Sequence, residues 1–165
     1  MTTALLLALL LGADSTTGDS LSKVTIGGIS FKAPTEWPST SDESGKEWTS
    51  PDERGKLAVS VFPVDPVRPP KACVSQLVEA VAANLGKENF TELNLGDNPA
   101  SRKVTTDYVG EGEAAKKDEN KVTTTTVVGC NGKTKWLVTY SARTADSARF
   151  GPILKRVLDS ITYGK

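Results

Sequence analysis

The segment from Lys121 to Ile161 constrains the fold most, because three structural signals follow one another there. Residues 122–128, Val-Thr-Thr-Thr-Thr-Val-Val, are all β-branched and predict a strand, since such side chains fit a pleated, half-buried surface. Asn131-Gly132 then provides a pair of residues that tolerates the positive φ angles of a type I′ hairpin turn. The first part of the segment therefore predicts a β-hairpin.

The second half of the segment predicts a return strand followed by a helix. Polar and apolar positions alternate over residues 133–142, which is typical of a strand with two different faces. One face carries Trp136, Val138 and Tyr140. Apolar residues then recur at the spacing of one helical face, at Phe150, Ile153, Leu154, Val157, Leu158 and Ile161. A hairpin covered by a helix is the expected arrangement.

The rest of the chain extends this pattern. Strands are expected at residues 24–26, 29–33, 47–49, 57–62, 90–95 and 103–109. A turn is expected at residues 97–99 and exposed loops at 39–45 and 110–120. A helix is expected over 71–85, with Gly86 as its stop, and it must lie on the sheet because it cannot be stable alone. The predicted fold class is α+β, an antiparallel sheet of about six to seven strands packed with two main helices in an α/β/α sandwich.

The N-terminus divides the chain into three expected parts. Residues 1–13 contain an unbroken apolar run that is too short to span a bilayer and ends in small residues, which predicts a secretory signal peptide. No Lys or Arg precedes the run, and a buried N-terminal helix is the alternative. Residues 14–22 are expected to be a flexible N-terminus, and 23–165 to be one domain. The chain is expected to be exported and to have no integral membrane span.

Two cysteines are present, and their state depends on the compartment. In an oxidising compartment Cys73 and Cys130 are expected to form a disulfide, because two cysteines in a small exported domain usually pair. The alternative is two small buried thiols in a reduced protein. A redox role has no support, since the sequence contains no CxxC motif.

The composition argues against several classes of function. The sequence has no histidine, which removes the commonest general base and metal ligand. The acidic residues between 42 and 53 lack the spacing of a calcium-binding loop, and no basic stripe with interleaved aromatic residues indicates nucleic-acid binding. Residues 131–165 carry seven basic and two acidic residues, which we interpret as a solvated face rather than a patch for an acidic partner. No enzyme, cofactor or metal site is predicted.

Several short motifs, taken in order, resemble a known family. The segment 29–34, Ile-Ser-Phe-Lys-Ala-Pro, precedes Trp37, and Asn98-Pro99-Ala100 precedes a strand that ends in Tyr108. Phe150 and the segment 158–161, Leu-Asp-Ser-Ile, close the chain. This order is similar to the PsbP-like α/β/α sandwich family, which includes photosystem II PsbP, the nuclear Ran-binding release factor and bacterial exported or chaperone relatives. The resemblance implies a domain that binds proteins, scaffolds complexes or holds client segments, without catalytic residues.

These observations predict a non-enzymatic exported domain that binds a protein partner or stabilises an assembly, with association to the cell envelope. The expected contact regions are the loops within 39–55 and 110–120. Trp37 and Trp136 are expected in the core, whereas Trp48 fits either the core or an exposed partner contact. The alternative function is a carrier or chaperone that holds a hydrophobic client segment, a lipid or a small ligand against the sheet.

Overall fold

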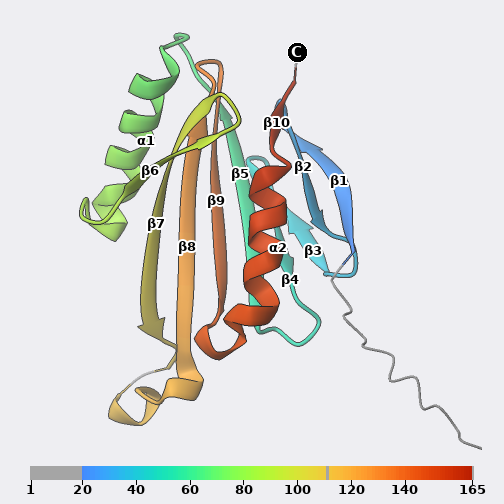
Figure 1. Ribbon diagram of the computed structural model, residues 1–165, viewed down its shortest axis with the longest axis vertical. Coiled ribbons are helices and arrows are strands. Elements are labelled where there is room, and N and C mark those ends of the chain that lie inside the picture. Colours follow the sequence, from blue (N-terminus) through green and yellow to red (C-terminus); the bar gives the residue numbers. More distant parts are fainter. Residues whose placement is uncertain (1–19, 111, 165) are drawn as a thin grey trace, which may run out of the picture.

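The computed structural model describes residues 20–110 and 112–164 (Figure 1). The expected signal peptide at 1–13 lies outside the described residues, as do residues 14–19 of the expected flexible segment. The first strand begins at Leu21 and pairs with Pro34, so regular structure starts two residues before the boundary expected at 23.

The strands form two antiparallel sheets, as the sequence predicted for the larger one. That sheet has the order β3-β4-β5-β9-β8-β7-β6. Its strands are β3 (Ser39–Ser41), β4 (Gly45–Thr49), β5 (Gly55–Pro63), β6 (Thr91–Leu95), β7 (Asn98–Tyr108), β8 (Lys121–Cys130) and β9 (Thr134–Arg143). The smaller sheet, which was not expected, consists of β1 (Leu21–Ile26), β2 (Ile29–Pro34) and β10 (Thr162–Tyr163). Because β10 has two residues, no periodicity could have indicated it.

Two helices pack on opposite faces of the large sheet. Helix α1 (Pro70–Leu85) shares a buried cluster with Val128, whereas α2 (Ser147–Asp159) shares the main core with the adjacent residue, Val127. Successive side chains of a strand point to opposite faces, so the two helices lie on different sides. The small sheet lies on the α2 side, where Ile29 joins the main core, and Figure 1 shows α2 running beside β2 and β10. The predicted α/β/α sandwich is therefore confirmed.

The hairpin between β8 and β9 forms as expected, but its turn is not of type I′. Gly132 has a φ of +93°, whereas Asn131 does not have the positive φ that this turn type requires. Instead, the Asn131 side-chain oxygen accepts hydrogen bonds from the backbone N–H groups of Lys133 (3.0 Å) and Thr134 (2.8 Å). Asn131 thus closes the turn through its side chain, a common role for Asn in turns.

Two other expected boundaries were wrong. Strand β7 begins at Asn98 and not near 103. Pro99 suggested a turn, but a proline is tolerated close to the start of a strand. The turn is therefore Gly96-Asp97. Residues 39–41, expected in a loop, pair with β4 as strand β3, and their side chains are exposed as predicted. A polar edge strand of three residues is held by backbone hydrogen bonds, so its side chains show no periodic pattern from which the strand could be predicted.

Helix α1 is attached to the sheet near both of its ends. Near its N-terminus Cys73 forms a disulfide with Cys130 of β8, with a Cα–Cα distance of 6.1 Å. At its C-terminus the Lys103 ammonium donates hydrogen bonds to the carbonyl oxygens of Leu85 (2.5 Å) and Gly86 (2.7 Å). Lys103 is only 6% exposed, and a cation at this position is favoured by the helix dipole and satisfies carbonyls that have no partner within the helix.

Replacing Lys103 tests this attachment. K103M keeps the length of the side chain but removes the charged donor, so the carbonyl groups of Leu85 and Gly86 lose two charge-assisted hydrogen bonds. We expect a loss of about 1–3 kcal/mol in the free energy of unfolding, measured by urea denaturation with the disulfide intact. K133M, in the exposed hairpin turn, is the matched control and should change stability by less than about 0.5 kcal/mol. Equal stability of both variants would contradict this role for Lys103.

Candidate functional site

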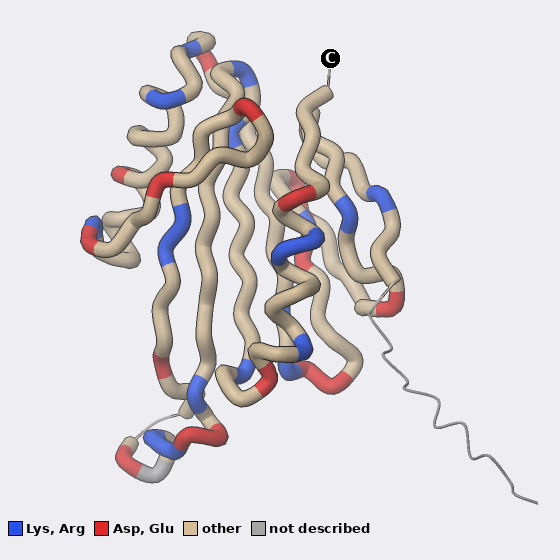
Figure 2. The backbone as a smooth tube through the Cα atoms, viewed as in Figure 1, with Lys and Arg blue, Asp and Glu red and all other residues tan. Residues whose placement is uncertain are grey.

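Charged residues gather at one end of the large sheet, where three connecting segments meet (Figure 2). We call this region the loop end and define it, within the described residues, as 50–54, 109–110, 112–120 and 144–149. The segments follow β4, β7 and β9, which run in the same direction in the antiparallel sheet, so the segments lie at the same end of the sheet. The strands carry few charges between their ends (Figure 2).

The segment 50–54 is shaped by one buried hydroxyl group. Ser50 Oγ accepts hydrogen bonds from the backbone N–H groups of Arg54 (3.0 Å) and Gly55 (2.9 Å). The same hydroxyl donates to Asp52 Oδ1 at 2.6 Å. This hydrogen bond, together with the guanidinium of Arg149, outweighs the effect of burial and lowers the pKa of Asp52 from 3.8 to about 2. Asp52 is therefore an anion at every physiological pH.

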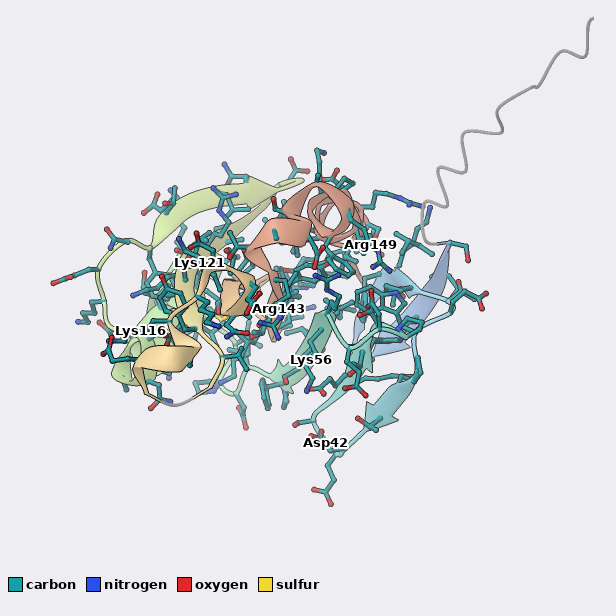
Figure 3. The ribbon with its side chains drawn as sticks, turned by 90° about the horizontal axis from the view of Figure 1, so that it is seen from below. Asp42, Lys56, Lys116, Lys121, Arg143 and Arg149 are labelled. Carbon is teal, nitrogen blue, oxygen red and sulfur yellow. A yellow bond between two sulfur atoms is a disulfide. The ribbon has the colours of Figure 1, made fainter. Side chains whose placement is uncertain are left out.

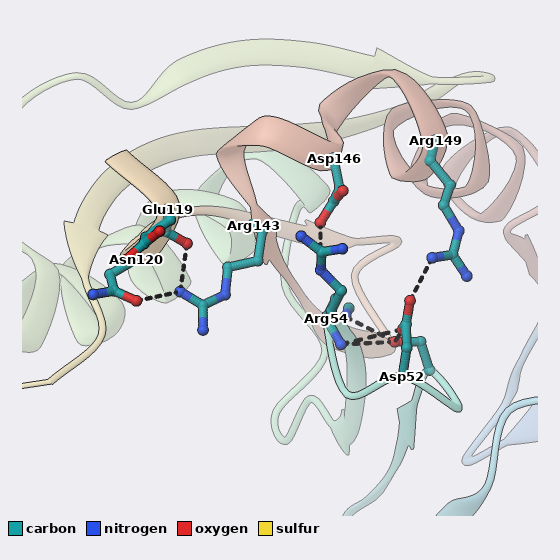
Figure 4. Close-up of polar contacts among 9 residues, drawn as sticks. Asp52, Arg54, Glu119, Asn120, Arg143, Asp146 and Arg149 are labelled. Atoms are coloured by element: carbon teal, nitrogen blue, oxygen red, sulfur yellow. Dashed lines mark hydrogen bonds and ion pairs between the residues drawn. The ribbon is translucent and has the colours of Figure 1, made fainter. Parts of the chain in front are cut away.

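Ion pairs connect this segment to the start of α2 (Figure 4). Arg149 Nη1 lies 2.5 Å from Asp52 Oδ2, and Arg54 Nε lies 3.0 Å from Asp146 Oδ2. The second contact is an ion pair without hydrogen-bond geometry, since this buried oxygen of Asp146 has no hydrogen-bond partner. Both arginine side chains are about half exposed. Solvent screens such pairs, so they orient the side chains more than they stabilise the fold.

A third arginine connects the segment 109–120 to the end of β9 (Figure 4). Arg143 Nη1 donates to the carbonyl oxygen of Glu119 (2.8 Å) and to Asn120 Oδ1 (3.2 Å). The segment itself contains two 3-10 turns, Glu113–Ala115 and Asp118–Asn120. Seen from below, Arg143 lies between Lys121 and Lys56 in the view of Figure 3. The loop end thus presents charges of both signs on a hydrogen-bonded framework.

Two apolar side chains are exposed beside these charges. Tyr108 is 37% and Val109 is 54% exposed, and the Val109 N–H donates to the Asn120 carbonyl oxygen at 2.9 Å. Aromatic and apolar groups surrounded by charges are typical of protein contact sites. Sequence reasoning missed this pair, although two successive apolar residues at the end of an alternating strand indicate that one of them faces solvent.

The structure decides between the two alternatives for Trp48, the core and an exposed partner contact. Its side chain is 3% exposed and packs edge-to-face on Phe31, with ring centroids 5.8 Å apart. Trp48 is opposite Leu57 of β5, on the face that the main core buries, so it is not a partner contact. Trp37 and Trp136 are also buried, as predicted.

The expected contact region 39–55 does not form one surface. Asp42 precedes β4 and Asp52 follows it, so the two carboxylates lie at opposite ends of that strand. Asp42 Oδ1 accepts hydrogen bonds from the N–H and hydroxyl groups of Ser44 and from the N–H of Gly45, which lower the pKa of Asp42. Of the region 39–55, only residues 50–54 reach the loop end, whereas the described residues of the expected segment 110–120 all lie there.

Within residues 20–110 and 112–164, no three acidic or cysteine side chains are grouped so that they could hold a metal ion. The same residues include no helix that is long and apolar enough to cross a membrane. The disulfide pairs both cysteines of the chain, so neither is a free thiol.

No protein-family model and no curated protein matches the sequence. Several solved structures resemble the fold at low sequence identity, among them the following three. A protein from Bacteroides thetaiotaomicron VPI-5482 gives a TM-score of 0.62 at 15% identity, over 83% of this chain and 45% of that protein, so this chain spans less than half of its length. Cyanobacterial PsbP from Synechocystis sp. PCC 6803 gives 0.58 at 12% identity, over 93% and 98% of the two chains.

The third structure is the Ran-binding protein Mog1p of Saccharomyces cerevisiae, with a TM-score of 0.52 at 9% identity over 87% of this chain and 95% of that protein. These likenesses confirm the PsbP-like fold that the sequence motifs predicted. Because one fold carries many functions, they assign no partner to this chain.

The low pKa of Asp52 makes the loop end sensitive to acid. Its folded pKa of about 2 lies below the ordinary value of 3.8, so Asp52 stabilises the fold fully above that value and loses its contribution as pH falls through about 2. D52N should therefore be less stable than wild type near neutral pH, and the difference should shrink between pH 3.8 and 2. Urea denaturation across this range measures it. E43Q, an exposed change outside the loop end, is the control, and a pH-independent D52N effect would contradict the assignment.

Proposed function

We propose that this chain is a non-catalytic, exported domain that binds a protein partner or stabilises an assembly, and that the loop end is its contact surface. The observation that carries the proposal is the placement of Tyr108 and Val109. Both side chains are exposed beside the charged residues of the loop end, outside the hydrophobic core. The absence of histidine from the sequence supports a non-catalytic role.

The framework beneath this surface favours binding. Arg143 joins the segment 109–120 to β9, and its backbone N–H donates to the Arg54 carbonyl oxygen at 3.2 Å. The three segments of the loop end are therefore connected by hydrogen bonds and ion pairs. A contact surface that is already ordered loses less conformational entropy when a partner binds, which favours affinity.

The charges predict how a partner would be recognised. Arg54 and Arg149 of the loop end are exposed, as is the nearby Lys56, and each has an acidic side chain beside it. A partner with its own mixed charges could exchange these pairs, while Tyr108 and Val109 provide the apolar centre. Association should therefore slow as the salt concentration rises, because long-range attraction is screened.

Two further observations support the remaining parts of the proposal. A disulfide between Cys73 and Cys130 is typical of proteins from oxidising compartments, which supports export to the cell envelope or beyond. Among proteins of similar fold, Mog1p is Ran-binding by name, so this fold is compatible with protein recognition.

A crosslinking pull-down from the native cell envelope tests the contact surface. V109D places a charge in the centre of the proposed contact, and we expect it to reduce recovery of the partner at least tenfold. The expectation follows because burying an unpaired charge costs several kcal/mol, and each 1.4 kcal/mol is tenfold in affinity. V67D introduces the same charge at an exposed valine outside the loop end and should not change recovery.

Thermal melting of both variants serves to separate lost binding from lost folding. Since Val67 and Val109 are both exposed, both variants should melt within a few degrees of wild type. A partner recovered equally well with V109D and V67D would contradict the proposed surface.

A further inference from the structure

A groove runs along α1 on the face of the sheet opposite to α2. Its apolar walls come from Leu77, Val81 and Leu85 of the helix and from Phe62 and Leu137 of the sheet, and its volume is about 580 Å³. Threonine side chains of β8 and β9 continue the wall beyond Leu137. Pockets for small molecules usually measure about 300–1,000 Å³ and are mostly apolar.

The groove exists because α1 covers only part of this face. The helix packs mainly on β8 and β7, where Val128 is fully buried beside the disulfide. Leu77, Val81 and Leu137 are only partly buried, and Leu85 is exposed. The strip of sheet between α1 and β5 therefore remains open, with apolar side chains on both sides of it.

One end of the groove is polar and basic. It continues into a second hollow of about 340 Å³, and Leu77, Ala80 and Lys135 line both. Arg68 and Asp65 also line this end, so its formal charge is one positive unit. Lys135 is half-buried, and within the described part of the chain its side chain makes no hydrogen bond or ion pair. A partly desolvated ammonium without an anion favours binding of one.

We propose that this groove binds a single-chain amphiphile with an anionic head, a medium-chain fatty acid. The carboxylate contacts Lys135 and Arg68, and the acyl chain lies between α1 and β5. The helical rise of about 1.5 Å per residue separates Leu77 from Leu85 by about 12 Å along the axis, which gives the chain an apolar path beyond the head.

An acyl chain fits this site better than a peptide does. The walls are side chains on a helix and on a sheet face, which leave few backbone groups free to pair with a peptide backbone. A buried peptide group without a hydrogen bond costs free energy, whereas an acyl chain has no polar group to satisfy. The volume of about 580 Å³ also lies within the range of about 300–1,000 Å³ that is usual for small-molecule pockets.

Calorimetric titration of the purified, delipidated and disulfide-intact chain with dodecanoate, below its micelle concentration, tests the proposal. We expect saturable binding that K135M weakens about tenfold, because it removes a charge-assisted contact worth about 1.4 kcal/mol or more. Binding of dodecanol, which lacks the charge, should be the same in K135M and wild type. K133M removes an exposed lysine outside the groove and is the matched control.

A second variant tests the acyl path. V81W fills the groove and should abolish binding of both dodecanoate and dodecanol, and L85W serves the same purpose at a more exposed position if V81W does not fold. The proposal would be overturned if dodecanoate did not bind to the wild type or if K135M and K133M had equal effects. It would also be overturned if an amphipathic peptide bound in the groove to the exclusion of dodecanoate. V109D should bind dodecanoate normally, so a failure of this proposal can be distinguished from a failure of the proposed contact surface at the loop end.

Discussion

The burial of both faces of the β8–β9 hairpin is the constraint on which the rest of the structure depends. Val127 pairs with Val138 on the α2 side, and Val128 pairs with Leu137 on the α1 side. A slip of one residue would exchange the two faces and expose apolar groups on both. Gly129 helps to fix the register, because a Cβ atom there would lie 2.1 Å from the ring of its partner Trp136.

This constraint also decides where binding can occur. Since the centre of the hairpin is packed on both sides, ligands and partners can reach only its ends or the strip that α1 leaves open. The loop end occupies the first position, where Arg143 terminates β9 and connects to the charged segment 109–120. The groove occupies the second, where Lys135 lies at the other end of the same strand. One strand thus contributes to two surfaces with different chemistry.

The sequence predicted those elements whose side chains repeat over several positions. The hairpin, both helices and the long strands were visible because their apolar residues follow a period set by burial. Strands β3 and β10 were missed because they are held mainly by backbone pairing over two or three residues. Trp48 was ambiguous because its neighbours in sequence are polar, although alternation within β4 directs it into the core.

The two candidate surfaces were less accessible to prediction. The segment 110–120 was recognised from its composition, but its connection to Arg143 depends on the antiparallel order of the sheet. The groove depends on how far α1 extends across β9 and β5, which no local pattern records. Lys135 therefore appeared as an ordinary solvated charge, and only its position between α1 and β5 distinguishes it.

The unfolding free energies of V127A and V128A test the central claim most directly. These adjacent valines are fully buried in separate clusters, so each substitution should cost about 1–3 kcal/mol through lost burial and a cavity. A large cost for one variant and no cost for its neighbour would show that one face of the hairpin is open to solvent, and would contradict the account.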